Sequence, residues 1–182
     1  RLIASDPAAA DAEVGELRTE LRAAIADIRR LVYDLRPPAL DELGLLGAIR
    51  ERAAQCHTAG AGTGSGDGDS GLTVTVEAAE PFPILPAAVE VAAYRIVMEA
   101  LTNAVRHARA RTCTVRLALS DHTVAVEVDD DGIGLPADHT PGVGLLSMRE
   151  RAAELGGSCV VSTRPDGGTR VAAHLPVPRT PP

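Results

Sequence analysis

The chain has 182 residues, a formal net charge of −7 and 2% aromatic residues. The negative charge argues against nucleic acid or an anionic lipid surface as a partner, and the scarcity of aromatic rings argues against base-stacking platforms for single strands. All 18 basic residues are arginine, so the chain lacks the lysine that a phosphate-binding loop of the G-x-x-x-x-G-K-[ST] type requires.

The first periodic segment is residues 14–35, where apolar residues recur at alternating steps of three and four. This spacing predicts one long helix with a heptad seam, which a single helix cannot bury without partner helices. The seam positions are Val14, Leu17, Leu21, Ala24, Ile28, Leu31 and Leu35. The helix is expected to end before Pro37-Pro38, because proline lacks a backbone amide and disfavours helix in the preceding residue.

A second amphipathic helix is predicted over residues 41–57, with Leu43, Leu46, Ile49 and Ala53 on one face.

Residues 59–71 are rich in Gly, Ser and Asp, a composition that predicts a flexible loop. Beyond this loop, strand-like and helix-like periodicities alternate. The predicted elements are a strand at 72–77, a long helix after Pro86, strands at 112–119 and 123–129, a loop at 131–143, a helix at 145–155, and strands at 158–163 and 169–175. Mostly antiparallel neighbours with helices on one side predict an α+β fold, a two-layer α/β sandwich. No apolar run of about 18 residues is present, so no membrane-spanning segment is predicted.

The three cysteines, Cys56, Cys113 and Cys159, are far apart and include no C-x-x-C pair. The sequence therefore supports neither a disulfide framework nor a zinc site, and a reducing compartment is the expected location.

A polar stripe lies in the long helix after Pro86. Glu99 and Asn103 are four residues apart on one helical face, and Arg106 and His107 follow one turn later. Asparagine is a poor helix-interior residue because its side chain competes for backbone hydrogen bonds. Hard oxygen ligands beside potential cations suit a Mg²⁺-phosphate site, since Mg²⁺ shares its shell with phosphates and water. The alternative is a solvated polar face.

Three glycine-containing segments follow. In DDDGIGLP (129–136), Asp130 can accept a hydrogen bond from an exocyclic amine, while Gly132 and Gly134 let the backbone approach a flat base. The alternative is an ordinary Asp-Gly turn.

The segment GVGLLSM (142–148) brings Gly142 and Gly144 to the start of a helix, whose free amides attract phosphate. Thr169, after Gly167-Gly168, opens the last strand, and a plain hairpin turn is the alternative there.

Together the four segments occur in the order E-x-x-x-N, D-x-G-x-G, G-x-G-L and G-G-T. This order resembles the nucleotide-binding boxes of the gyrase, Hsp90, histidine kinase and MutL ATPase superfamily. Four segments are similar in sequence to histidine kinases of the nitrate-sensor and DesK type: EALTNAVRHA, DDGIGLP, GVGLLSMRERAAELGG and GGTRV. The segment IADIRRLVYDLRPPALDELGLLGAI likewise resembles the second helix of that family's dimerisation domain, running into its linker.

The resemblance implies a Bergerat ATP-binding fold over residues 39–178, preceded by one long dimerisation helix within residues 1–38. It implies a protein histidine kinase that transfers the γ-phosphoryl group of ATP to a histidine and thence to a response regulator. The full-length protein would form a homodimer through residues 14–35. The expected location is the cytoplasm, either as a free protein or as the cytoplasmic part of a membrane-anchored sensor.

For the phosphate side, the resemblance implies that Asn103 coordinates Mg²⁺, that Glu99 helps to hold metal or water, and that Arg106 and His107 lie near the phosphates. The ATP lid would span about residues 135–143. The lid-side positions implied to contact nucleotide are Gly142, Gly144 and Leu145.

For the adenine side, Asp130 would bond the adenine amino group, and Gly132 and Gly134 would pack against the base. Thr169 would support the pocket near Asp130.

The chain departs from the family in one respect. The family's phosphoacceptor histidine sits in a box that reads roughly E-L-H-D, and none of the five histidines of this chain has that context. The phosphoacceptor is therefore expected upstream of Arg1. Two alternatives stay open: an anti-sigma-type serine kinase of the same fold, and a degenerate, non-catalytic dimerisation or docking module. Topoisomerase, chaperone and mismatch-repair ATPases are disfavoured, because they reach the γ-phosphate with a lysine from a second domain.

Overall fold

The computed structural model describes residues 36–59, 71–136 and 142–178. The chain divides into two compact units, Arg1–Pro37 and Pro38–Pro182. The heptad helix predicted at 14–35, most of the loop predicted at 59–71 and the middle of the lid predicted at 135–143 lie outside the described residues.

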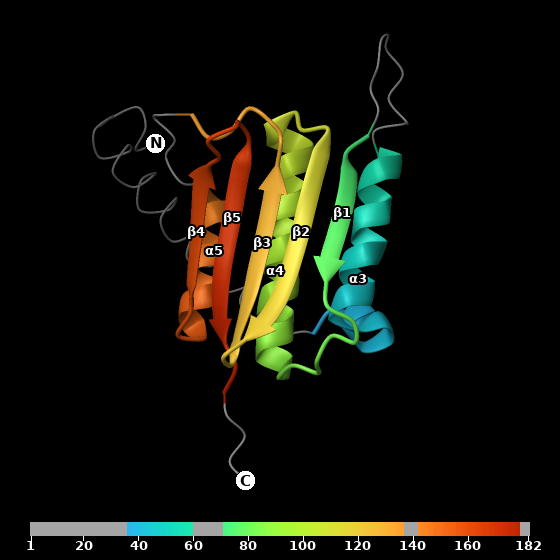
Figure 1. Cartoon of the computed structure of the whole chain (residues 1–182), viewed down its shortest axis with the longest axis vertical. Coiled ribbons are helices and arrows are strands. Elements are labelled where there is room, and N and C mark those ends of the chain that lie inside the picture. Colours follow the sequence, from blue (N-terminus) through green and yellow to red (C-terminus); the bar gives the residue numbers. More distant parts are fainter. Residues whose placement is uncertain (1–35, 60–70, 137–141, 179–182) are drawn as a thin grey trace, which may run out of the picture. The chain divides into compact units, whose positions relative to one another are not determined.

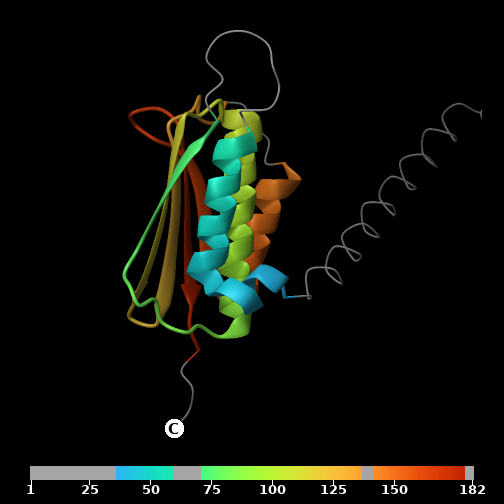
Figure 2. The same ribbon diagram turned by 90° about the vertical axis from the view of Figure 1, so that its right-hand side faces the viewer.

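Within the described residues, five strands form one mixed sheet, and the helices lie on one of its faces (Figure 1, Figure 2). Across the sheet the strands are β1 (Thr73–Ala78), β2 (Thr112–Ser120), β3 (Thr123–Asp130), β5 (Thr169–Pro176) and β4 (Ser158–Thr163). The helices are α3 (Pro38–Ala59), α4 (Ala87–Asn103) and α5 (Val143–Glu154), and a π-helical segment, η1 (Ala104–Ala108), continues α4. This arrangement confirms the predicted two-layer α/β sandwich.

The core lies between the sheet and the helices. Alternation along β2 buries Cys113, Val115 and Leu117 against the helical layer, while the residues between them face the other side. Helix α4 lies over the middle of the sheet and buries Ile96 and Leu101 completely. Each such aliphatic side chain stabilises the fold by roughly 1.5–3 kcal/mol relative to leaving it exposed.

The sheet contains one parallel pair among otherwise antiparallel neighbours. Strand β1 pairs with β2 in parallel, with Thr73 opposite Thr112, whereas β2–β3, β3–β5 and β5–β4 are antiparallel. A parallel pair needs a crossover connection, and the segment containing α4 and η1 supplies it. Cys113, near the start of β2, lies opposite Asp130, the last residue of β3. The crossover therefore returns to the sheet beside the C-terminal end of β3.

The helix predicted at 41–57 is part of α3, which is interrupted at Gly44 (φ 66°, ψ 178°). Ile49 and Ala53 are buried as predicted. The prediction for Leu43 was wrong: its side chain is 48% exposed, and Leu45 is the buried residue, at 5% exposed. The non-helical backbone at Gly44, which glycine adopts without steric cost, resets the direction of the side chains on either side of it.

Candidate functional site

The end of α4 carries the predicted polar stripe. Glu99 and Asn103 lie on the last turns of α4, and both are half-buried. The widened π turn of η1 begins at the next residue and places Arg106 and His107 in exposed positions. Single π turns inside α-helices are frequent at functional sites, because they redirect the side chains around them. The stripe therefore combines two half-buried oxygen donors with two exposed potential cations.

Helix α5 approaches this stripe at Gly144. A Cβ atom at Gly144 would lie 1.9 Å from Glu99 Oε1, so the Glu99 carboxylate occupies the space that any larger residue would need. Gly142 is the N-cap residue of α5 and has no side chain to cap the first turn, and the first amides of a helix attract anions. Leu145 is half-buried and packs against the core. The sequence predicted these residues individually, and the proximity of Gly144 to Glu99 comes from the structure.

Asp130, the last residue of β3, is 7% exposed. Its Oδ1 atom accepts hydrogen bonds from the amides of Gly132 (2.9 Å) and Thr169 (3.1 Å). Within the described residues, Oδ2 accepts no hydrogen bond and yet is not sealed from solvent. A carboxylate held through one oxygen and open at the other is suited to accept one hydrogen bond from a ligand donor.

The loop after Asp130 is packed on its two flanks. A Cβ at Gly132 would lie 2.2 Å from the carbonyl oxygen of Ala108, and the Ile133 amide donates to that same oxygen over 2.9 Å. Gly134 adopts φ +73°, and a Cβ there would lie 2.8 Å from the Thr163 side chain. The loop thus follows a path, between η1 and the β4–β5 hairpin, that only glycine permits at these positions.

The neighbours of Asp130 in the DDD sequence have other roles. Asp131 fixes the start of β2: its carboxylate accepts from the amides of Arg111 and Thr112 at 2.8 and 2.9 Å, and from Thr112 Oγ1. Partial burial would raise the pKa of Asp131, but these hydrogen bonds lower it overall.

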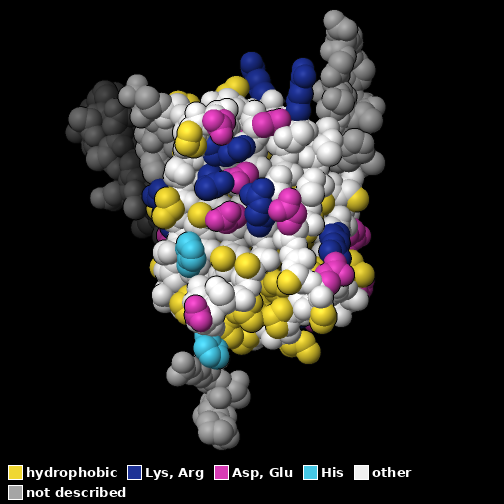
Figure 3. Space-filling view, viewed as in Figure 1, with side chains coloured by type: hydrophobic (Ala, Val, Ile, Leu, Met, Phe, Trp, Pro, Cys, Tyr) yellow, Lys and Arg dark blue, Asp and Glu magenta, His cyan; other side chains and the backbone are white. Residues whose placement is uncertain are grey.

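Asp129 faces the side of the sheet that carries no helices. It forms a charge ladder with residues on three other strands: Arg116 bonds both Glu77 and Asp129 at 2.9 Å, and Arg170 bonds Asp129 through two nitrogens at 2.6 and 2.7 Å. Figure 3 shows charged side chains gathered on this face. The hydrogen bonds from Arg170 hold the pKa of Asp129 below its usual value against the opposing effect of burial, and Arg116 adds to the lowering. Among these three aspartates, Asp130 alone keeps a free carboxylate oxygen beside the glycine loop.

Two residues that the sequence did not indicate complete the group around Asp130 and the loop that follows it. Thr163 Oγ1 accepts from the Leu135 amide at 3.3 Å, and Arg164 Nη1 donates to the carbonyl oxygen of Asp130 at 2.8 Å. Both precede the Pro165-Asp166-Gly167-Gly168 turn, where nothing in the local sequence indicates a contact with a loop some 30 residues earlier. Only the sheet register between β3, β5 and β4 places them there.

Metal binding by protein side chains alone is not indicated. In the described ranges, no group of three or more His, Cys, Asp or Glu side chains could hold a metal ion. Glu99 and Asn103 offer one carboxylate and one amide oxygen, a donor set that fits Mg²⁺ if nucleotide phosphates and water complete its shell.

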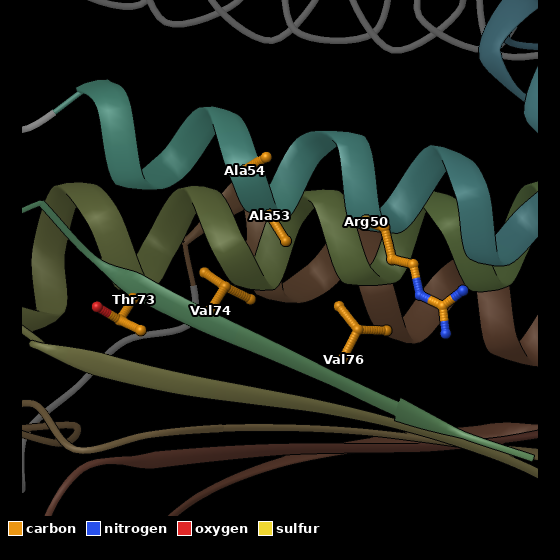
Figure 4. A pocket seen from close by; sticks show the side chains of 6 residues that line it. All are labelled: Arg50, Ala53, Ala54, Thr73, Val74 and Val76. Carbon is orange, nitrogen blue, oxygen red and sulfur yellow. The ribbon is translucent and has the colours of Figure 1, made fainter.

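A separate groove of about 400 Å³ lies between α3 and the edge strand β1 (Figure 4). It is lined by Arg50, Ala53, Ala54, Thr73, Val74 and Val76. None of these residues belongs to the predicted site, and Arg50 is already paired with Glu80 at its rim. The groove reflects the small side chains of α3 opposite β1 and does not displace the site at the end of β3.

Comparison with known sequences decides the family. The family described as histidine kinase-, DNA gyrase B-, and HSP90-like ATPases matches residues 88–179, a range that contains every site residue predicted above. The chain belongs to this family. A histidine kinase family also matches residues 1–40. The unit Pro38–Pro182 is therefore a histidine kinase ATPase domain, and ATP is the nucleotide that its family membership supports.

Several curated relatives are sensor kinases. The chain is 30% identical over 169 residues to the signal transduction histidine-protein kinase/phosphatase DegS of Brevibacillus brevis, covering 91% of this chain and 41% of the relative. It is 34% identical over 166 residues to UhpB of Salmonella typhimurium, with 89% and 31% covered. It is 32% identical over 160 residues to the nitrate/nitrite sensor protein NarX of Escherichia coli, with 87% and 25% covered. The chain thus spans between a quarter and two fifths of these relatives.

The solved structures agree on the fold. The histidine kinase domain of the blue-light activated histidine kinase of Erythrobacter litoralis matches with a TM-score of 0.60 and 24% identity, covering 77% of this chain and 69% of that one.

In the described part of the present chain, no helix is both long and apolar enough to span a bilayer.

Proposed function

We propose that this chain is the ATP-binding catalytic part of a two-component sensor histidine kinase, with Asp130 selecting adenine and Asn103 helping to hold Mg²⁺ at the phosphates. The observation that carries the proposal is the state of Asp130: one carboxylate oxygen is fixed by two backbone amides, and the other is open beside a loop that glycine alone permits. Adenine presents an amino donor at its 6-position, which an open carboxylate oxygen can accept.

The phosphate side is proposed to consist of Glu99, Asn103 and the N-terminal amides of α5. Arg106 and His107 are exposed one turn beyond Asn103, where they can approach phosphate oxygens. Bound Mg²⁺ would neutralise phosphate charge. Phosphoryl transfer asks the protein mainly for positioning and charge stabilisation, so a site without a nucleophile is chemically sufficient.

The phosphoryl acceptor and the protein partners are proposed from the interpretation of this chain as part of a sensor kinase. We propose that the γ-phosphoryl group passes to a histidine of the dimerisation domain in the full-length protein and then to a response regulator. The homodimer would form through residues 14–35. A cytoplasmic location for this part is proposed because ATP is available there and because all three cysteines are buried and unpaired.

The test is calorimetric titration of ATP into the chain with and without Mg²⁺, beside the Asn103→Ala variant. Saturable binding that strengthens with Mg²⁺ in the wild type, and loses that dependence in the variant, is expected because the amide oxygen ligand is gone. A folded chain that binds no ATP would instead support the degenerate docking module. An unchanged Mg²⁺ dependence in the variant would remove Asn103 from the metal site.

A further inference from the structure

The hairpin between β4 and β5 holds Asp130 at three points. The Thr169 amide bonds its carboxylate, Arg164 Nη1 bonds its carbonyl oxygen, and Gly168 packs so closely that a Cβ would lie 2.0 Å from that carbonyl oxygen. The hairpin is itself closed by the Arg164 amide, which donates to Gly168 O at 2.9 Å, and by the Gly167 amide, which donates to Arg164 O at 3.1 Å. Arg164 therefore joins the turn to the loop through both its backbone and its side chain.

The guanidinium contact acts on the direction of the carboxylate. The carbonyl of Asp130 belongs to the same residue as the free oxygen Oδ2, and it opens the loop that runs on through Gly132 and Gly134. A half-buried, charged donor on this carbonyl helps to fix the peptide after Asp130, whose other group, the Asp131 amide, donates to Thr112 O at 3.2 Å. That peptide leads to Gly132, whose amide bonds Asp130 Oδ1. By helping to place this amide, the Arg164 contact helps to set the orientation of the carboxylate and of its free oxygen Oδ2.

We propose that Arg164 is a positioning residue that sets the preference of this site for adenine over guanine. The proposal rests on the nucleotide function proposed above. Arg164 acts through the Asp130 backbone, and the discrimination comes from the aligned carboxylate. Adenine offers an amino donor to this carboxylate, whereas guanine carries a carbonyl oxygen at the same ring position and meets it with repulsion.

A purely structural role for Arg164 makes a different prediction, and Arg170 provides the matched control. Arg170 also lies beside the end of β3, but it bonds the carboxylate of Asp129 through two nitrogens on the opposite face of the sheet. Replacing Arg170 removes more hydrogen bonds than replacing Arg164, yet it leaves all contacts of Asp130 in place. We therefore expect replacement of Arg170 to lower stability without changing base preference, and replacement of Arg164 to change base preference.

The experiment compares the full chain as wild type, Arg164→Ala, Arg164→Lys and Arg170→Ala. Each protein is titrated with ATP and with GTP against a fluorescent ATP analogue, and its thermal melting is recorded without nucleotide. For Arg164→Ala we expect the ATP affinity to fall about tenfold while the GTP affinity changes by less than about threefold, so that the preference narrows. Arg164→Lys should lie between Arg164→Ala and the wild type, because one donor remains. Arg170→Ala should lower the melting temperature and keep the preference.

Equal loss of both affinities in Arg164→Ala, or an unchanged ratio, would overturn the proposal. If Arg164→Ala does not fold, Arg164→Lys decides: a narrowed ratio supports the positioning role, and a wild-type ratio contradicts it. Failure of the wild type to bind ATP in this assay would refute the proposed nucleotide function, an outcome distinct from a wild type that binds ATP while its variants keep their preference.

Discussion

The two ends of the proposed nucleotide site are built differently. At the adenine end, Asp130, Gly132, Gly134 and Thr169 are joined by hydrogen bonds and close backbone contacts to η1 and the β4–β5 hairpin. At the phosphate end, Gly144 closely approaches Glu99, and Arg106 and His107 are exposed.

This difference follows from what each end has to recognise. A neutral base is discriminated by one fixed acceptor, and a fixed acceptor needs a rigid backbone. Phosphates and Mg²⁺ carry charge and bring their own ligands, so the protein can leave that end open until they arrive. Substitutions at the adenine end should therefore cost stability and base preference, whereas those at the phosphate end should leave the free chain's stability nearly unchanged.

The largest effect is expected from Gly168→Ala, with Gly167→Ala as the matched control. Both glycines adopt φ near +87°, but a Cβ at Gly168 would lie 2.0 Å from Asp130 O, while one at Gly167 meets nothing nearer than 4.0 Å. We expect Gly167→Ala to cost about 1 kcal/mol for its backbone conformation alone. Gly168→Ala should cost about 3 kcal/mol or more, because backbone must also move. Urea unfolding measures both, and equal costs would show that the adenine end is less rigid than its contacts indicate.

Asp130→Asn should come next, with Asp129→Asn beside it. Replacing the open oxygen by an amide donor should weaken ATP binding about 30-fold and narrow the preference for ATP over GTP, because the acceptor for the amino group is lost. Asp129→Asn breaks the charge ladder on the far face and should keep the preference. The measurement is competition binding with both nucleotides. Equal preference before and after would remove Asp130 from the base site.

At the phosphate end, Gly144→Ala should weaken MgATP binding about tenfold by displacing the Glu99 carboxylate, while changing the free energy of unfolding by less than about 0.5 kcal/mol. The displaced atoms are the end of a flexible side chain, which can move at little cost. Gly142→Ala is the control, since a Cβ there meets nothing within 4 Å. In a Glu99→Ala background, Gly144→Ala should have no further effect. An additional loss in the double variant would show that Gly144 acts independently of Glu99.

The smallest effect is expected at acid pH. The pKa of Asp129 is lowered in the folded chain by Arg170 and Arg116 against burial, so the stability it provides is present above the unfolded value of about 4 and is lost as pH falls through the folded value. Urea unfolding between pH 6 and 3 should show a shallower loss for Asp129→Asn than for the wild type. The two slopes of unfolding free energy against pH should differ by less than about 1.4 kcal/mol per pH unit, the value for one proton. Identical slopes would mean that the ladder does not brace the end of β3.

The order of elements could be predicted from the sequence because helix and strand periodicity are local properties. The strands predicted at 112–119 and 123–129 are present and are joined by a tight hairpin, in which Asp121 and His122 adopt the left-handed conformation. The kink at Gly44 could not be predicted, because a glycine inside an amphipathic pattern is compatible with a continuous helix as well as with a break. The parallel pairing of β1 with β2 could not be predicted either, because side chains alternate between the two faces in the same way in parallel and antiparallel strands.

For the candidate site, the sequence by itself determined which residue types are available and in what order: a carboxylate and an amide on one helical face, an aspartate after a strand, and glycines at a loop, a helix start and a hairpin. Tertiary structure alone decided which of three adjacent aspartates keeps an open oxygen, that Gly144 makes room for Glu99, and that Arg164 bonds the Asp130 carbonyl. The physical reason is that these properties depend on atoms from 13 to 45 residues apart, which the register of the sheet and the packing of α5 on α4 bring together.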